Sequence, residues 1–270
     1  MNLSEVKLIV TDMDGTLLNS NHEVSSLFFE QFNKLKENNI QFVAASGRQY
    51  HSILSKLKTI KEHITIVAEN GAYVKRNNEE IFINAFSKND IKELLYICKN
   101  IDGAHIILCG KQKAYFLNVS EQFEKTVSEY YSEYEIIESF NSLPKDDFLK
   151  IAICHYDGSE TNLYPKVKHL ENKWQIKISG KQWLDIALPA NHKGNAIERI
   201  QKEYGVTANQ TMAFGDYHND IEMLKKARYS FAMQNAHPKV KQIASYETLS
   251  NDALGVESII TKLLTETNNN

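Results

Sequence analysis

Short apolar runs that each stop at a polar or glycine cluster constrain the fold of this chain more than any other feature. They lie at residues 6–10, 42–45, 64–68, 212–214 and 229–233. Continuous apolar runs of this length, rich in β-branched and aromatic side chains, are typical of strands buried on both faces of a parallel sheet. Because parallel strands need crossover connections, we expect helices between the runs.

Apolar side chains at helical spacing between the runs support this expectation. Residues 25–38 show it behind Ser25, a residue type that caps helix N-termini, and residues 195–204 show it before Gly205, a residue type that ends helices. Strand and helix therefore alternate, which predicts a doubly wound, mainly parallel α/β sheet. Ligands of such sheets bind at the carboxyl ends of the strands. Shorter helical patterns cover residues 220–227 and 237–244.

The middle of the chain has a different pattern. Its apolar runs alternate with polar side chains, and helical patterns cover residues 120–134 and 163–173. Alternation is typical of half-buried strands in an antiparallel sheet. We therefore expect an α+β domain at 84–186, inserted between the halves 1–83 and 187–270 of the α/β body. The tail from Glu266 to Asn270 is expected to be disordered.

Charge and cysteine content exclude several classes of partner. The formal net charge is -3 and no run of five or more Lys or Arg occurs, so nucleic acid is not an expected partner. The three cysteines have no CxxC spacing, which indicates neither a disulfide framework nor a zinc site. The N-terminal apolar stretch is interrupted by Lys7 and is too short for a signal core or a membrane span. We expect a soluble cytoplasmic protein without an obligate protein partner.

Chemically useful residues follow the apolar runs. Asp12 and Asp14 come directly after the first run, and paired carboxylates in one cleft can hold Mg²⁺ beside a substrate phosphate. One carboxylate can then attack phosphorus while the other handles the proton of the leaving group. Taken alone, this pair also fits a polar turn, Ser46 fits a helix cap, and Lys193 fits a solvated surface lysine. Their order along one predicted sheet edge favours the chemical interpretation.

At this point the chain resembles the haloacid dehalogenase superfamily, and within it the Cof-type phosphatases of subclass IIB. Four motifs of that family are matched along nearly the whole chain. The first is DxDGTL at Asp12 to Leu17, the second SGR at Ser46 to Arg48, the third KG at Lys193 and Gly194, and the fourth GDxxND at Gly215 to Asp220. A secondary signature, Glu69-Asn70-Gly71-Ala72, agrees. The resemblance implies that the domain at 84–186 is a cap that confers substrate specificity.

The resemblance also implies roles for the carboxylates. Asp12 becomes the nucleophile and a metal ligand. Asp14 becomes the general acid and later the base, with its backbone carbonyl as a second ligand. Asp216 completes the site for Mg²⁺, the implied cofactor.

The remaining motif residues are implied to hold the phosphate. Ser46 and the Gly47 amide bind phosphoryl oxygens, Lys193 neutralises charge in the transition state, and Asn219 binds phosphate or orients its neighbours. Asp220 either ligates the metal through water or positions Lys193.

Three further residues of the motifs have other implications. Arg48 suits substrate contact and equally suits an ion pair within the body. His218 is expected to have a structural or rim role rather than one in acid-base chemistry, since the resemblance gives that role to Asp14. Tyr217 departs from the small or short polar residue that many relatives carry after GD.

These motifs predict a phosphoric monoester hydrolase that acts on sugar phosphates or similar small metabolites through a phospho-aspartate on Asp12. Two alternatives remain. A phosphotransferase such as a phosphomutase uses the same first motif, with a hydroxyl in place of water as the acceptor. A regulatory protein would retain the fold without turnover, and fold alone does not exclude it.

Overall fold

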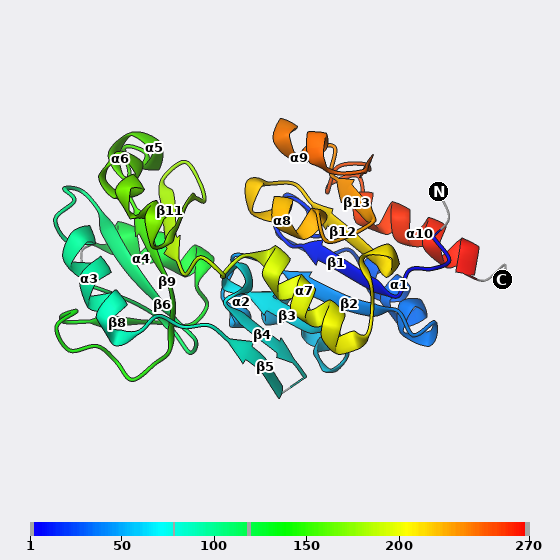
Figure 1. The fold of residues 1–270 in the computed structure, drawn as a ribbon, viewed down its shortest axis with the longest axis horizontal. Helices are drawn as coiled ribbons and strands as arrows, with labels where there is room; N and C mark the ends of the chain where they lie inside the picture. The colour runs from blue at the N-terminus through cyan, green and yellow to red at the C-terminus, as the bar shows by residue number, and fades with distance from the viewer. Residues whose placement is uncertain (1–2, 78, 118–119, 268–270) are drawn as a thin grey trace. The chain divides into compact units, whose positions relative to one another are not determined.

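The computed structural model describes residues 3–77, 79–117 and 120–267. The chain forms two compact units, each visible in Figure 1. The first unit comprises Met1–Gly47, Ile53–Phe82 and His192–Asn270, and the second comprises Arg48–Ser52 and Ile83–Asn191.

The apolar runs form the strands of the first unit. In the described residues these strands pair in the order β14-β13-β12-β1-β2-β3-β4-β5. Neighbours from β14 to β3 run parallel, and β4 returns antiparallel beside β3. The predicted mainly parallel α/β sheet is confirmed. Its strands are β1 (Leu8–Asp12), β2 (Gln41–Ala45), β3 (Thr65–Ala68), β4 (Tyr73–Arg76), β5 (Glu79–Ile83), β12 (Thr211–Gly215), β13 (Tyr229–Ala232) and β14 (Tyr246–Glu247).

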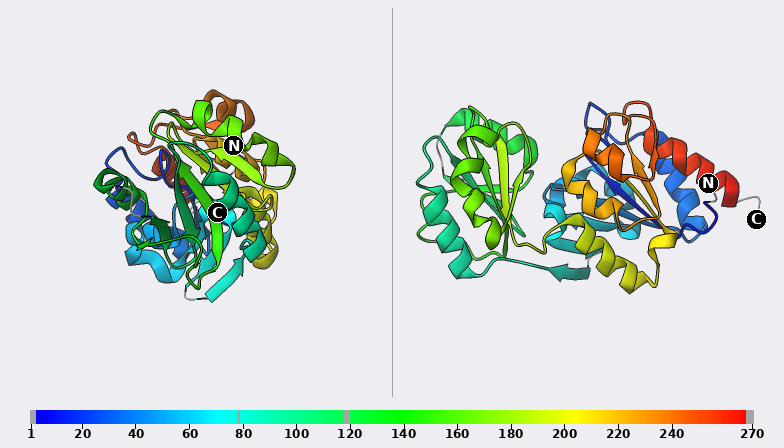
Figure 2. Two further views of the ribbon diagram at one scale, coloured as in Figure 1. Left: turned by 90° about the vertical axis from the view of Figure 1, so that its left-hand side faces the viewer. Right: turned by 45° about the horizontal axis from the view of Figure 1, so that its top comes forward.

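Helices cover both faces of this sheet (Figures 1 and 2). The step from β1 to β2 and the step from β12 to β13 lead in opposite directions across the sheet, so right-handed crossovers place their helices on opposite faces. On one face α1 packs against α10, and on the other α7 packs against α8. The helices are α1 (Ser26–Glu37), α2 (Tyr50–Lys56), α7 (Lys193–Tyr204), α8 (Ile221–Leu224), α9 (Pro238–Ile243) and α10 (Gly255–Thr267).

The change of direction beside β1 determines where a ligand can bind. The chain leaves β1 toward β2 on one side, and β12 lies on the other. A crevice opens outside the carboxyl ends of the strands at such a switch point. Asp12, the last residue of β1, lies at this edge.

The second unit is built on its own sheet, in the order β10-β11-β9-β6-β7-β8 among the described residues. Its strands pair antiparallel, except that β8 runs parallel to β7. The elements are α3 (Lys88–Cys98), β6 (His105–Gly110), β7 (Ala114–Leu117), α4 (Glu121–Tyr130), β8 (Tyr134–Ile137), β9 (Phe148–Cys154), α5 (Ser159–Asn162), α6 (Tyr164–Val167), β10 (Gln175–Ile178) and β11 (Trp183–Ala187).

Each face of this second sheet has its own apolar core. Side chains of α3 and α6 pack with one face, including Leu94 and Val167. Side chains of α4 pack with the other, including Phe123 and Val127.

Several predicted element boundaries are wrong. The helix expected over residues 120–134 ends at Tyr130, because the next residue, Tyr131, is extended and has its ring buried in the core under α4. The helix expected over 163–173 is divided into α6 and a 3-10 helix (Lys168–Asn172). The helix expected over 220–227 ends as α8 at Leu224.

The prediction of a disordered tail is wrong where the structure describes it. Glu266 and Thr267 belong to α10, and the Glu266 carboxylate accepts a hydrogen bond from the Leu3 amide at 2.6 Å. Residues 268–270 lie outside the described residues.

The two ends of the long segment of the second unit are joined by a pair of asparagines. Asn84 Nδ2 donates to Asn191 Oδ1 at 2.6 Å, and Asn191 Nδ2 donates to the Asn84 carbonyl at 3.1 Å. Asn191 is fully buried. The long segment Ile83–Asn191 therefore begins and ends at one place.

Candidate active site

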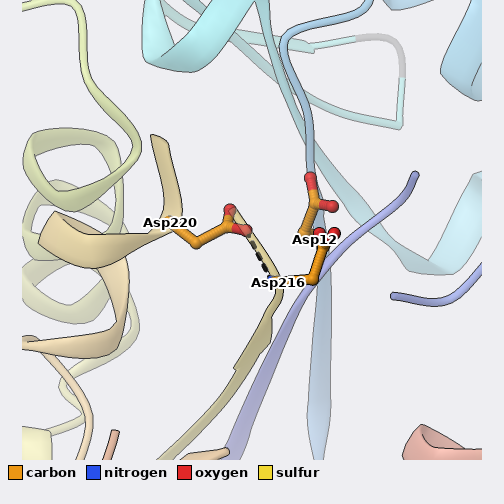
Figure 3. Close-up of side chains that lie close together, drawn as sticks. All are labelled: Asp12, Asp216 and Asp220. Carbon is orange, nitrogen blue, oxygen red and sulfur yellow. Dashed lines mark hydrogen bonds between the residues drawn. The ribbon is translucent and has the colours of Figure 1, made fainter. Parts of the chain in front are cut away.

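Three carboxylates meet at the carboxyl edge of the first sheet (Figure 3). Asp12 ends β1, Asp216 directly follows β12, and Asp220 ends the short 3-10 helix (His218–Asp220) that comes next. One oxygen from each of the three lies within 4.8 Å of the others. The parallel pairing of β1 with β12 brings about this convergence, because it places the two strand ends at the same edge.

Lys193 provides the positive charge of this cluster. It is the first residue of α7, and its side chain is 0% exposed. Its ammonium contacts the Asp12 carboxylate and donates a hydrogen bond to Asp220 Oδ1 at 2.7 Å. Burial would lower the pKa of Lys193, but the carboxylates of Asp12 and Asp220 outweigh it and hold the pKa above its ordinary value. The ammonium therefore stays charged.

The residues around Lys193 explain its position. The His192 imidazole caps α7 by accepting a hydrogen bond from the Asn195 amide at 3.1 Å. A Cβ at position 194 would lie 2.5 Å from the Glu222 carbonyl oxygen. The KG motif thus combines a buried cation with a glycine that lets α7 approach α8 closely.

The carboxylates repel one another. Burial, followed by the negative charge of Asp220, raises the pKa of Asp12 well above its usual value. The same two causes raise the pKa of Asp216 to about 7. Three carboxylates gather here with one ammonium, and their excess negative charge favours a bound cation.

Asp216 is held in place by the first motif. The Thr16 hydroxyl donates to Asp216 Oδ1 at 3.2 Å. Gly15 has a φ of +73°, and a Cβ there would overlap the Asp216 carboxylate. Gly15 therefore gives both the turn after β1 and the space for Asp216.

Asp220 uses both of its oxygens within the protein. Oδ1 accepts from Lys193, and Oδ2 accepts from the backbone amides of Asp216 and Tyr217 at 2.9 and 3.1 Å. These contacts favour positioning of Lys193 and of the turn, which was one of the two roles expected for Asp220. Asp12 and Asp216 remain the better donors for a metal, and carboxylate oxygens suit a hard divalent cation.

Asp14 is separate from this cluster of carboxylates. Its Oδ1 lies 3.5 Å from His22 Nδ1, and 42% of its side chain is exposed. A partly exposed carboxyl group near the site suits proton exchange with a leaving group or water. Sequence reasoning missed His22, since no motif includes it and its left-handed backbone, with φ 58°, has no sequence signature.

The remaining predicted residues lie after β2, at positions 46–48, and after β12, at position 219. Ser46, directly after β2, is buried, and its amide donates to the Val67 carbonyl at 2.9 Å. Asn219 Nδ2 donates to Asn70 Oδ1 at 3.0 Å. Gly47 ends a segment of the first unit, whereas Arg48 begins the short segment assigned to the second unit.

Tyr217 and His218 form an aromatic group after Asp216. Tyr217 is 41% exposed, and its ring meets the His218 ring edge-on. The His218 and His237 ring centroids lie 4.2 Å apart. His218 therefore packs against the rings of Tyr217 and His237.

Comparison with known proteins identifies the family. A profile of haloacid dehalogenase-like hydrolases matches residues 9–260. The 5-amino-6-(5-phospho-D-ribitylamino)uracil phosphatase YbjI of Escherichia coli K12 is 35% identical over 266 residues, which cover 96% of each chain.

Solved structures agree in fold. A protein from Streptococcus mutans matches with a TM-score of 0.89 and 34% identity, over 96% of this chain and 99% of that one. A subclass IIB sugar phosphatase of the HAD superfamily matches with a TM-score of 0.82 and 22% identity, over 95% and 98% of the two chains. No helix in the described residues has the length and apolar character needed to cross a membrane. The chain belongs to the haloacid dehalogenase-like hydrolase family, in the class of phosphoric monoester hydrolases.

Proposed function

We propose that this protein is a Mg²⁺-dependent phosphatase that hydrolyses small phosphorylated metabolites through a phospho-aspartate on Asp12. The observation that carries the proposal is the buried Lys193 ammonium, which lies between the carboxylates of Asp12 and Asp220. A nucleophile for phosphorus must approach a negatively charged group, and a fixed cation beside it offsets that charge.

In the first half of the reaction, an Asp12 oxygen attacks phosphorus in line with the leaving oxygen. The bond from phosphorus to the leaving oxygen breaks, and Asp14 donates the proton that this oxygen needs. Lys193 balances charge on Asp12 and on the phosphoryl oxygens as the transition state develops.

In the second half, Asp14 accepts a proton from a water molecule, which attacks the phosphorus of the phospho-aspartate. The bond from phosphorus to the Asp12 oxygen breaks, so inorganic phosphate leaves and the carboxylate is regenerated. Asp14 thus serves as acid and then as base, a dual use that needs a group open to solvent exchange.

The oxygen donors and the excess negative charge fit Mg²⁺. Asp12, Asp216 and the Asp14 carbonyl would hold the ion, which would supply positive charge beside the phosphoryl oxygens. The protein groups that hold the phosphoryl are the Ser46 hydroxyl, the Gly47 amide and the Asn219 side chain. Arg48 is proposed to contact substrate.

The substrate class follows from the relatives. One relative is named for a ribitylaminouracil phosphate and one solved structure is a sugar phosphatase. We therefore propose a phosphomonoester on a sugar or polyol chain. In this proposal residues 84–186 act as a cap that recognises the part of the substrate beyond the phosphate.

Phosphate release from a panel of compounds tests the proposal. The panel contains sugar phosphates, nucleotides, p-nitrophenyl phosphate and 5-amino-6-(5-phospho-D-ribitylamino)uracil, each with Mg²⁺ and with EDTA. Wild type is compared with Asp12→Asn, which keeps the shape of the side chain but removes the nucleophile. We expect metal-dependent release that this substitution abolishes. Release that survives in Asp12→Asn would overturn the phospho-aspartate, and transfer to an added alcohol in place of water would identify a phosphotransferase.

A further inference from the structure

The turn formed by Glu69, Asn70 and Gly71 contacts the loop after β2, the start of α7 and the Asn219 side chain. We propose that Asn70 is a positioning residue that orients the Asn219 amide toward the phosphoryl group. This inference rests on the proposed function, because Asn219 is proposed there to bind phosphate.

The backbone of this turn is unusual. Glu69, Asn70 and Gly71 have φ values of 50°, 56° and 103°, so three successive residues occupy the left-handed region. Non-glycine residues adopt this region at a cost, and they persist there when surrounding contacts hold them. Both Glu69 and Asn70 are buried. A strained, buried turn directly after β3 indicates a position that the surrounding site requires.

The turn contacts the loop after β2. The Asn70 amide donates to the Ser46 carbonyl at 2.9 Å. A Cβ at Gly47 would lie 3.1 Å from both the Nδ2 and the Oδ1 atom of Asn70. The Asn70 side chain therefore packs directly on the Gly47 backbone, whose amide is proposed to hold a phosphoryl oxygen.

The same turn contacts the start of α7. A Cβ at Gly71 would lie 2.7 Å from the carbonyl oxygen of His192, the residue before Lys193. Glycine at this position permits both the left-handed backbone and the close approach to α7. The turn thus fixes the distance between the loop after β2 and the helix that carries Lys193.

Asn70 also determines how Asn219 is oriented. A side-chain amide donates hydrogen bonds through its NH₂ group and accepts them through its oxygen, whereas phosphoryl oxygens only accept. Asn70 Oδ1 accepts from Asn219 Nδ2 at 3.0 Å, which turns the NH₂ group of Asn219 toward the side where Asn70 packs on Gly47. One N–H is used by Asn70, and the second remains to donate to a phosphoryl oxygen. Without the Asn70 acceptor, Asn219 loses the contact that selects this orientation.

A double-mutant cycle separates positioning from general structural support. The variants are Asn70→Gly, Asn219→Ala and the double variant. Glycine retains the left-handed backbone while removing the side chain. Asn39→Gly is the matched control, since Asn39 also has a positive φ of 57° but is exposed and precedes β2 at the opposite edge of the sheet.

Two quantities are measured for each protein: KM and kcat for p-nitrophenyl phosphate with Mg²⁺, and binding of inorganic phosphate by calorimetry. We expect Asn70→Gly to weaken phosphate binding and raise KM about tenfold, the size of one lost charge-assisted hydrogen bond. Adding Asn70→Gly to Asn219→Ala should have little further effect. The control should match wild type.

The inference is overturned if Asn70→Gly binds phosphate as the control does, or if its effect adds fully to that of Asn219→Ala. If wild type releases no phosphate from any ester, the proposed function fails, while phosphate binding still tests the role of Asn70. If Asn70→Gly does not fold, as judged by its melting curve, Asn70→Ser takes its place, because the serine hydroxyl is too short to reach Asn219.

Discussion

Each unit of this protein buries a lysine beside aspartate, and the two pairs differ in charge balance. In the second unit, Lys150 Nζ lies 3.4 Å from Asp185 Oδ2, with side chains 5% and 10% exposed. In the first unit, Lys193 is shared by Asp12 and Asp220, and Asp216 adds a third carboxylate. Among the residues that the structure describes, Asp185 belongs to no acidic group able to hold a metal. The comparison indicates that excess negative charge, rather than burial of an ion pair, distinguishes the chemical site.

The largest expected contrast is in turnover. Lys193→Met should lower kcat by about 10³-fold or more, since it removes the cation that offsets charge at Asp12. Lys150→Met removes a buried lysine of the other unit and should leave kcat per folded molecule within about threefold of wild type. Steady-state kinetics with p-nitrophenyl phosphate measures both. Equal losses in the two variants would refute the distinction between the pairs.

A second contrast concerns the free energy of unfolding. Lys150→Met leaves a buried carboxylate without its lysine and should cost about 3 to 5 kcal/mol. The double variant Lys150→Met with Asp185→Leu should recover most of this loss, because an apolar pair of similar volume needs no desolvation. Urea unfolding followed by circular dichroism measures the change. A double variant as unstable as the single one would show that the ion pair itself contributes the stability.

A third contrast is the response to Mg²⁺. Ligand binding to the folded state at about 100 times the dissociation constant adds about 2.7 kcal/mol of stability. Wild type should therefore melt at a higher temperature with Mg²⁺ than with EDTA, and Asp216→Asn should lose this shift. Asp185→Asn is the control, and it should retain the Mg²⁺-dependent shift whatever its own melting temperature. A shift that survives in Asp216→Asn would place the metal elsewhere.

The smallest expected effect tests the support of Asp216. Thr16→Val keeps the shape of a buried side chain but removes the hydroxyl that donates to Asp216. We expect Mg²⁺ to bind about tenfold more weakly, the lower end of the usual effect of groups that orient metal ligands. Calorimetric titration measures it. Thr65→Val is the control, since the Thr65 hydroxyl contacts Tyr204, and an equal change there would remove the specific role of Thr16.

The sequence predicted the central strands and the helices on either side of them. Continuous apolar runs and capping residues are local signals, so β1, β2 and α1 lie close to their expected positions. Helix α10 was missed even though Val256, Ile260 and Leu263 have helical spacing and are buried. Strands β4 and β5 were missed because their residues alternate weakly and carry several charges.

The site could be predicted as a set of motifs but not as a set of contacts. The motif residues Asp12, Asp216 and Lys193 do converge in the structure. The use of both Asp220 oxygens by protein groups could not be predicted, because it depends on the turn that brings two backbone amides to one carboxylate. The hydrogen bond between Asn70 and Asn219 could not be predicted either, because the two residues are 149 positions apart in sequence.

The asparagine pair that joins the two ends of the long segment of the second unit has a consequence for protein engineering. Asn84 and Asn191 hold together, by two hydrogen bonds, the points where the chain enters and leaves this segment. A domain grafted at this point needs only closely spaced termini, a property that many compact domains share. Exchange of the whole segment between these asparagines is therefore a simple route to a chimera in which the first unit meets a different insert without redesign of its own sheet.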